Sequence, residues 1–303
     1  MKDNKSCAST SINWFPGHMV KTMSEIKSKL KLIDIVIEVV DSRLPISSRN
    51  HMIDEIVKDK PRIIIMNKYD LSDKKKLNEF KNYFESKNMS VVFTNAQNGD
   101  NINKVLYLIN EIGGKIYKEK IEKKNIAMKP IYRVCIVGIP NVGKSTIINK
   151  LSKKTSAEVG NRPGVTKKSQ WIRLSENIEL MDTPGVLWPK LDENKAGIKL
   201  ALTGNIKQEV IDSPSLAIEG IKILTCDDKY KNRLKERYKL EDNLDDLEIY
   251  EILEKMAKNR GCVLKGNEID YERISNIFLD EFKNGKIGNF VLDNLKEVEE
   301  KKK

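Results

Sequence analysis

The stretch GIPNVGKST, from Gly138 to Thr146, has the residue types and spacing of a phosphate-binding loop. It fits the pattern G-x-x-x-x-G-K-[ST] without a mismatch. In this pattern glycines let backbone N–H groups face an anion, Lys144 places a positive charge on the β- and γ-phosphates, and the Ser145 hydroxyl binds Mg²⁺. The remaining nucleotide contacts of this loop are expected from Asn141, Val142, Gly143 and Thr146.

The residues around this loop predict the elements that the motif requires. The apolar run 131–137 precedes the loop and predicts a strand, and the run 145–151 follows it and predicts a helix. A strand, a tight turn and a helix N-terminus together form an anion-binding site. A plain glycine turn before a helix is the alternative interpretation, and the strand before the loop disfavours it.

A second motif, Asn67-Lys68-Tyr69-Asp70, follows a predicted strand at 62–66. The Asp70 carboxylate can accept two hydrogen bonds from the N1 and N2 edge of guanine, and adenine offers no such pair of donors. The Asn67 side chain can bond the purine ring, and the stem of Lys68 can lie over it. In isolation these four residues would indicate a solvated loop, but beside a phosphate loop they favour a guanine site.

Three further segments fit the same pocket. Asp182-Thr-Pro-Gly185 follows a predicted strand at 178–181, so Asp182 is expected near Mg²⁺ and the Gly185 N–H near the γ-phosphate. The same residues predict a β-turn, and the two interpretations are compatible. Thr166, in a polar loop over 155–170, is the candidate switch threonine that senses the γ-phosphate through Mg²⁺. Asn95 and Ala96 follow a predicted strand at 90–94 and would support the base through backbone N–H groups.

The order of these motifs differs from that of an ordinary GTPase, in which the phosphate loop comes first. Here NKYD and Asn95-Ala96 precede the phosphate loop, and Thr166 and DTPG follow it. The pocket requires only that the loops meet at the carboxyl ends of neighbouring strands. The sequence therefore predicts a circularly permuted, doubly wound α/β domain with a mostly parallel sheet. We expect the charged stretch 115–129, after a helix over 102–112 that ends at Gly113-Gly114, to join the old termini.

The chain is expected to divide into four parts. Residues 1–12 are polar and predicted to be disordered, 13–205 form the GTPase domain, 206–295 form a smaller all-helical domain, and 296–303 form a charged tail. The permuted order connects DTPG directly to the helical domain. We therefore expect the helical domain to dock differently on the GTPase domain when GTP is bound than when GDP is bound.

Net charge, cysteine spacing and the length of apolar segments limit the kind of protein this chain can be and the kind of partner it can bind. The 303 residues carry a net charge of +11, which favours a polyanionic partner such as RNA, DNA or a membrane surface. Residues 206–303 hold 19 Lys and Arg and 22 Asp and Glu, so the basic excess lies in residues 1–205. A compositional bias toward Lys and Asn would explain the same excess. The four cysteines are widely spaced, and no segment has the length of a membrane span.

The chain resembles the circularly permuted ribosome-assembly GTPases. The resemblance rests on the motif order, on WFPGHM at 14–19, on IPNVGKST, on DTPGVLWP and on the helical C-terminal part, and it covers about residues 14–290. It implies a cytoplasmic GTPase that binds GTP and Mg²⁺. We further expect no membrane partner and a monomeric state. The resemblance also implies binding to the large ribosomal subunit precursor and its ribosomal RNA, a late step of assembly, and GTP hydrolysis stimulated by the ribosomal particle.

The group that orients the attacking water is not evident. Val186 and Leu187 follow Gly185, where a classical small GTPase places a glutamine. His18 is one candidate, because an imidazole titrates near neutral pH and the resemblance points to the same residue; a structural turn histidine is the equal alternative. The other candidate is K⁺, held partly by Asn141. Two further functions stay open: a GTP-binding scaffold on RNA with little catalysis, and an ATPase or kinase, against which NKYD argues.

Overall fold

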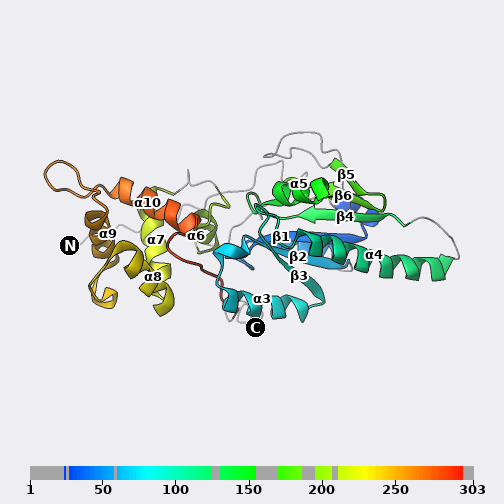
Figure 1. Cartoon of the computed structure of the whole chain (residues 1–303), viewed down its shortest axis with the longest axis horizontal. Helices are drawn as coiled ribbons and strands as arrows, with labels where there is room; N and C mark the ends of the chain where they lie inside the picture. The colour runs from blue at the N-terminus through cyan, green and yellow to red at the C-terminus, as the bar shows by residue number, and fades with distance from the viewer. Residues whose placement is uncertain are drawn as a thin grey trace, which may run out of the picture.

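The computed structural model describes Ser24 and residues 27–57, 60–124, 130–154, 170–185, 195–206 and 211–295. Within these residues the chain forms two lobes side by side along the long axis of the molecule (Figure 1). One lobe contains the sheet and its helices, and the other is helical. Residues 1–12, the WFPGHM segment with His18, Thr166, Val186-Leu187 and the tail 296–303 lie outside the described residues.

The first lobe is organised around a six-stranded sheet in the order β3-β2-β1-β4-β6-β5. Neighbouring strands are parallel except β5, which runs antiparallel to β6. The strand bounds are β1 Ile35–Asp41, β2 Arg62–Asn67, β3 Met89–Thr94, β4 Tyr132–Val137, β5 Gln170–Ser175 and β6 Ile178–Asp182. Strands β1, β2, β4 and β6 are buried along nearly their whole length, whereas β3, at the edge of the sheet, is mostly half-buried. Such apolar runs are typical of parallel strands covered on both faces.

Helices cover the sheet on both sides (Figure 1). Their bounds are α2 His51–Ile56, α3 Lys74–Glu85, α4 Ile102–Lys124 and α5 Lys144–Lys154, with 3-10 turns at Leu30–Leu32 and Tyr69–Leu71. Alternate residues of β2 pack into different clusters. Ile64 and Met66 pack with α3, whereas Ile63 and Ile65 join the larger core that includes α4 and α5. This alternation is what a strand buried on both faces requires.

The predicted helix end at Gly113-Gly114 is wrong, because α4 continues through both glycines to Lys124. The charged stretch that was expected as a connector therefore begins as helix. Ile112 and Ile116 pack against the core on either side of the two glycines. Gly113 also faces the ring of Tyr132, and a Cβ there would lie 2.5 Å from that ring. Tertiary packing thus outweighs the low helix propensity of the pair, which costs about 1 kcal/mol per glycine.

This packing predicts opposite effects of two neighbouring substitutions. Gly113→Ala is expected to lower the free energy of unfolding by about 1–3 kcal/mol, because the new Cβ overpacks the site against Tyr132. Gly114→Ala is the matched control, since no atom lies within 4 Å of its Cβ position. It should raise the free energy of unfolding by about 0.5–1 kcal/mol through helix propensity. Urea denaturation of both variants measures the pair, and equal effects would contradict the packing described here.

The second lobe is all-helical, as predicted. It contains α7 Ser213–Thr225, α8 Asp228–Tyr238, α9 Ile249–Asn259 and α10 Tyr271–Lys283, with a 3-10 turn at Leu244–Asp246. The helices begin at side-chain caps that the sequence supplies. Asp212, Asp227 and Asp270 each accept hydrogen bonds from the first turn of the helix that follows. Glu248 and Glu251 form a capping box at α9.

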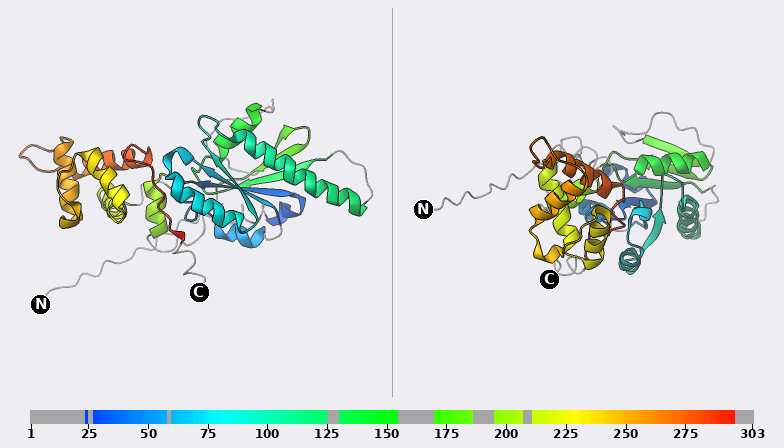
Figure 2. Two further views of the ribbon diagram at one scale, coloured as in Figure 1. Left: turned by 60° about the horizontal axis from the view of Figure 1, so that its bottom comes forward. Right: turned by 60° about the vertical axis from the view of Figure 1, so that its left-hand side comes forward.

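Two elements were not predicted from the sequence, β5 and α6 Lys195–Leu202. Helix α6 packs against α7 and α10. We therefore propose that the helical domain includes α6, so that it begins no later than Lys195 and earlier than the expected boundary at 205/206. After α10 the chain returns to the first lobe, where the Leu292 N–H donates to the Arg43 carbonyl (Figure 2).

The fold confirms the predicted architecture of a mostly parallel, doubly wound sheet followed by a helical region. The phosphate loop follows β4, and Asn95-Ala96 follows β3. NKYD and DTPG each begin with the last residue of a strand, β2 and β6 respectively. Each motif thus leaves the carboxyl end of a parallel strand, so circular permutation leaves their spatial arrangement intact. Within the described ranges no helix has both the length and the apolar character needed to cross a membrane.

Candidate nucleotide-binding site

The phosphate loop turns between the end of β4 and the first residue of α5, Lys144. Gly143 has φ of +100°, and a Cβ there would lie 2.3 Å from Asn67 Nδ2. Asn141 also adopts a left-handed conformation, with φ of 58°, which asparagine tolerates better than most residues. The loop therefore depends on its residue types for both its backbone shape and its close contact with the guanine motif.

Lys144 is the buried cation of this loop. Its side chain is 8% exposed, and Nζ donates to the carbonyls of Gly138 and Ile139, both at 2.9 Å. Burial lowers the pKa of Lys144 to about 8, and the nearby Asp182 carboxylate opposes that shift. The charge is thus held inside the loop at the end of β4, where the pattern places the phosphates.

Asn67 connects three of the predicted motifs. Its Nδ2 donates to the Val142 carbonyl at 2.8 Å, which holds the phosphate loop. Its Oδ1 accepts from Thr94 Oγ1 at 3.1 Å and from the Ala96 N–H at 3.0 Å, which holds the loop after β3. Loops that are far apart in sequence are thereby brought together. In this structure the buried Asn67 side chain and the Ala96 N–H bind neighbouring loops. These bonds give both residues a role in positioning the loops.

The other residues of the guanine motif differ in their surroundings. Lys68 has a left-handed backbone, with φ of 60°, and its Nζ lies 2.9 Å from Asp41 Oδ2. Asp70 is exposed at the surface, as a group that recognises a base edge must be before the base binds. Asn95 accepts from the N–H groups of Gln97 and Asn98, so its side chain shapes its own loop.

DTPG lies against the phosphate loop. Thr183 Oγ1 donates to the Ile136 carbonyl at 2.7 Å, which joins the end of β6 to β4. A Cβ on Gly185 would lie 2.8 Å from the Pro140 backbone nitrogen and 3.1 Å from Lys144 Nζ. The Gly185 backbone is therefore next to the cation that the pattern assigns to the γ-phosphate.

The protein groups available to Mg²⁺ are hard oxygen donors. Ser145 is the second residue of α5, directly after Lys144, and Asp182, 4% exposed, ends strand β6, which neighbours β4. Within the described part of the chain, no group of three or more His, Cys, Asp or Glu side chains could hold a metal. This composition suits Mg²⁺, which binds through one or two protein oxygens together with substrate phosphates and water. Thr166, the third predicted ligand, is outside the described residues, as is His18.

Sequence reasoning missed two residues beside this site, Asp41 and Asn205. Asp41 ends β1 and is fully buried, and it accepts hydrogen bonds from Arg43, Lys68 and Asn205. A signal for Asp41 was present, since it follows a buried strand in the same way as the four motifs. Asn205 had no such signal, because it comes from the helical side of the molecule.

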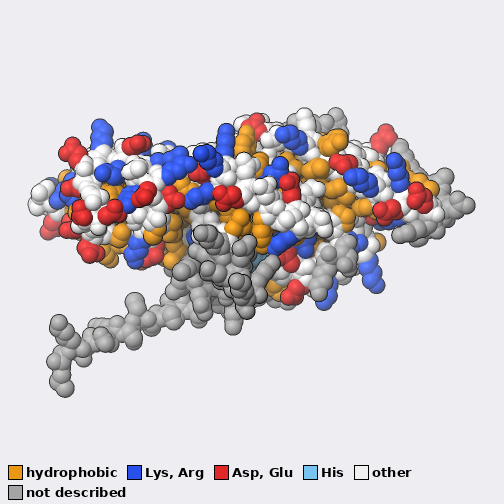
Figure 3. Space-filling model, turned by 90° about the horizontal axis from the view of Figure 1, so that it is seen from below, with side chains coloured by type: hydrophobic (Ala, Val, Ile, Leu, Met, Phe, Trp, Pro, Cys, Tyr) orange, Lys and Arg blue, Asp and Glu red, His pale blue; other side chains and the backbone are white. Residues whose placement is uncertain are grey.

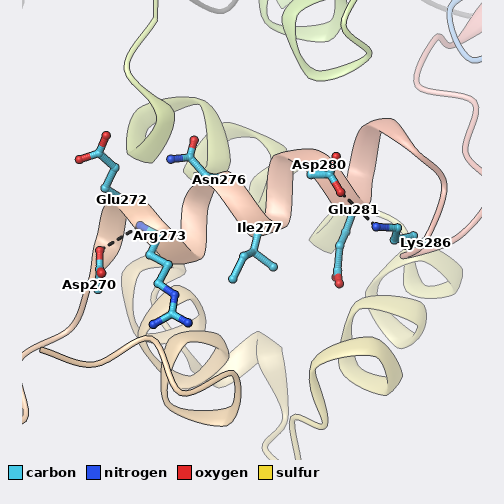
Figure 4. A pocket seen from close by; sticks show the side chains of 8 residues that line it. All are labelled: Asp270, Glu272, Arg273, Asn276, Ile277, Asp280, Glu281 and Lys286. Atoms are coloured by element: carbon cyan, nitrogen blue, oxygen red, sulfur yellow. Dashed lines mark hydrogen bonds and ion pairs between the residues drawn. The ribbon is translucent and has the colours of Figure 1, made fainter.

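The helical domain offers no continuous basic surface on the face shown in Figure 3. Lys and Arg side chains are interspersed with Asp and Glu there. A hollow of about 720 Å³ lies along α10 and is drawn in Figure 4. Its lining combines acidic and basic side chains, with acids in excess: Asp270, Glu272, Arg273, Asn276, Ile277, Asp280, Glu281 and Lys286. This hollow is in the other lobe from the phosphate loop and has the wrong charge balance for a phosphate group.

Comparison with known proteins places these features in a family. A family profile described as 50S ribosome-binding GTPase matches residues 133–264. Ribosome biogenesis GTPase A of Bacillus cereus is 43% identical over 95% of this chain and 96% of the relative. The corresponding protein of Priestia megaterium is 40% identical over 95% of this chain and 99% of the relative. Mitochondrial ribosome-associated GTPase 1 of Mus musculus is 33% identical over 92% of this chain and 89% of the relative.

Solved structures agree with these matches. The GDP-bound structure of TM YlqF has a TM-score of 0.61 and 28% sequence identity, and the match covers 90% of this chain and 99% of that chain. GNP-bound YlqF from T. maritima has a TM-score of 0.58 and 27% identity, covering 90% of this chain and 98% of that chain. The matches extend over both lobes.

Proposed function

This chain belongs to the ribosome biogenesis GTPase A family of circularly permuted GTPases, and from that premise we propose that it acts on the precursor of the large ribosomal subunit. The chain is a GTP hydrolase with a role in ribosome assembly. The proposal adds that it promotes a late step, that the ribosomal particle stimulates its GTP hydrolysis, and that it works as a cytoplasmic monomer. The observation that carries the proposal is identity of 40–43% to relatives of that name over more than nine tenths of the chain.

The described residues account for how GTP would be bound. Backbone N–H groups of the phosphate loop and Lys144 face the phosphates, and the exposed Asp70 carboxylate accepts from the guanine edge. Ser145 and Asp182 would hold Mg²⁺, which neutralises charge on the phosphates when it is bound. Asn67 holds the phosphate loop, the guanine motif and the loop after β3 in one arrangement. Catalysis by such a site is mainly positioning and electrostatic stabilisation.

Two groups remain candidates for orienting or activating the attacking water. His18 would act as a polar group beside the γ-phosphate, and K⁺ bound in part by Asn141 would supply a fixed positive charge. In the structure Asn141 Nδ2 donates to the Asn205 carbonyl at 3.3 Å, so its Oδ1 is the atom that would face a cation. Thr166 would complete the Mg²⁺ site through its hydroxyl.

The buried lysine predicts proton uptake when nucleotide binds. With a pKa of about 8, Lys144 is about half protonated in the free protein at pH 8. Phosphate anions raise this pKa, so binding should take up about half a proton at pH 8 and about a tenth of a proton at pH 7. The affinity for GDP should accordingly fall as the pH rises above 8. Calorimetry in two buffers of different ionisation enthalpy measures the uptake, and no uptake at pH 8 would contradict the assigned surroundings of Lys144.

The function is tested by GTP turnover with purified large subunits, with small subunits and with neither, in K⁺ and in Na⁺. We expect large subunits to raise turnover at least tenfold and small subunits to leave it unchanged. Loss of this stimulation in His18→Ala would support His18 near the chemistry, and His51→Ala, at the exposed start of α2, is the matched control. Loss in Na⁺ would support K⁺. Equal rates with all particles would overturn the proposal of ribosome-stimulated hydrolysis and leave a GTP-binding scaffold.

A further inference from the structure

A buried carboxylate at the end of β1 lies between the nucleotide loops and the helical domain. Asp41 is fully buried; its Oδ1 accepts from Arg43 Nε at 2.9 Å, and its Oδ2 accepts from Arg43 Nη2 at 2.8 Å. Oδ2 also accepts from Lys68 Nζ at 2.9 Å and from Asn205 Nδ2 at 3.2 Å. Burial alone would raise the pKa of Asp41, but the Arg43 and Lys68 cations hold it far below its usual range. A charged carboxylate therefore joins a residue of the guanine motif to a residue that follows α6.

Asn205 contacts the nucleotide loops at two places at once. Its carbonyl accepts from Asn141 Nδ2 of the phosphate loop at 3.3 Å. Its side-chain Oδ1 lies 3.4 Å from Lys68 Nζ of the guanine motif. Its Nδ2 donates to Thr203 Oγ1 at 2.8 Å as well as to Asp41. Asn205 is fully buried, and its bonds to Asp41 and Thr203 are buried as well, whereas those to Lys68 and Asn141 are partly buried. Burial strengthens the hydrogen bond to the charged Asp41 carboxylate most.

The position of Asn205 is set by the helical domain. Its N–H donates to the Leu200 carbonyl at 2.9 Å, and the Gly204 N–H donates to the Ala201 carbonyl at 3.0 Å. Gly204 has φ of +72°, so these bonds form a Schellman motif at the end of α6. Because α6 packs on α7 and α10, a movement of the helical domain would carry Asn205 with it.

A second segment of the helical side holds the guanine motif from another direction. Asn289 Nδ2 donates to the Asp70 carbonyl at 2.8 Å, and the Phe290 N–H donates to the Leu71 carbonyl at 3.1 Å. Asp293 accepts from the N–H groups of Ile46 and Ser47 in the loop after β1, at 2.8 and 2.7 Å. The loop that recognises the base is thus fixed by the sheet domain on one side and by residues after α10 on the other.

We infer that Asn205 is a positioning residue of the GTP site, through which docking of the helical domain and binding of nucleotide are coupled. Asn205 holds the amine of Lys68 and the side chain of Asn141 while α6 holds Asn205. A change in docking therefore changes both the phosphate loop and the guanine motif, and nucleotide in turn changes docking by the same factor. This inference rests on GTP binding alone and not on the ribosomal partner. In this inference, the contacts of Asn205 with Asp41 and Asn141 link the helical domain to the nucleotide site. The chain segment after DTPG, from which the sequence predicted such a link, is not needed.

Two substitutions of Asn205 separate positioning from simple packing. Asn205→Ala removes the side-chain bonds to Asp41 and Lys68, and should weaken binding of fluorescent GDP and of a GTP analogue about tenfold. Asn205→Asp keeps the size and shape but places a second carboxylate against Asp41. It should weaken binding more than Asn205→Ala, about a hundredfold, because buried like charges repel. If the residue only filled space, both variants would lower the free energy of unfolding but leave the nucleotide affinity of the folded protein within twofold of wild type.

A matched control and a distant variant distinguish a specific loss of nucleotide affinity from a general loss of stability. Asn259→Ala also removes two hydrogen bonds within the helical domain, to the Tyr238 and Lys239 carbonyls, and should leave affinity within twofold of wild type. Asp293→Ala releases the loop after β1 without touching the nucleotide motifs, and coupling predicts about fivefold weaker binding. GDP should also slow hydrogen exchange in α6 of the wild-type protein. Affinities of Asn205→Ala and Asp293→Ala within twofold of wild type, or equal exchange with and without GDP, would overturn the inference.

Discussion

Replacing Lys144 by methionine is expected to lower kcat/KM for GTP hydrolysis by about a thousandfold or more. The substitution removes the buried cation that faces the phosphates, and an interaction of this kind in a dry site contributes several kcal/mol to the transition state. The folded protein should nevertheless become at least as stable as the wild type. Burial lowers the pKa of Lys144, so without nucleotide its charge opposes folding at neutral pH, and a methionine avoids that cost.

Two measurements check this pair of effects, steady-state GTP turnover and urea denaturation without nucleotide. Lys150→Met in the same helix, α5, is the control and should change neither quantity appreciably. A Lys144→Met protein that kept a tenth of wild-type turnover would contradict the assigned role. A clearly less stable Lys144→Met protein would show that the buried amine stabilises the loop through its bonds to the Gly138 and Ile139 carbonyls.

Replacing Arg43 by methionine is expected to lower the free energy of unfolding by about 3–5 kcal/mol, because it leaves the buried Asp41 carboxylate without its principal cation. Arg43 also donates to the Lys283 and Thr203 carbonyls, both at 2.9 Å, so the same change weakens contact between the domains. Lys222→Met breaks an exposed ion pair with Glu219 and should cost at most about 1 kcal/mol. Thermal and urea unfolding of both variants measures the difference. A cost below 1 kcal/mol for Arg43→Met would contradict the account of this interface.

Asp41 also gives this prediction a pH dependence. Its pKa in the folded protein is far below its usual value, so its contribution to stability is fully present above pH 4. That contribution is lost as the pH falls further below 4 and the unfolded state binds a proton that the folded state does not. Arg43→Met raises the pKa of Asp41 and should make this part of the acid destabilisation smaller.

The parts of the fold predicted correctly from the sequence are those with local signals. The strands that precede the four nucleotide motifs are short, mainly apolar segments, and their carboxyl ends had to lie at one edge of a parallel sheet. The order of motifs then predicted the permutation, because the pocket depends on spatial and not sequential order. The helical character of the part after residue 205 was also predicted correctly, and helices α7 to α10 lie there.

The parts that were wrong or missed depend on tertiary contacts. Two consecutive glycines favour a helix end, but the ring of Tyr132, which faces Gly113, lies on a strand elsewhere in the chain. Strand β5 alternates between exposed and buried residues at the edge of the sheet, which gave too weak a signal. The contact between Asp41 and Asn205 joins residues 164 positions apart, and nothing near Asn205 indicates it. Such pairings are specified by the packing of whole domains.

The most direct test of the role in large-subunit assembly is depletion of the protein in growing cells, followed by separation of ribosomal particles on a sucrose gradient. We predict that immature large-subunit particles accumulate and sediment close to the mature subunit, because the proposed step is late. Re-expression of the wild-type chain should clear them, whereas Lys144→Met should not. Accumulation of small-subunit precursors, or a normal particle profile after depletion, would contradict the account.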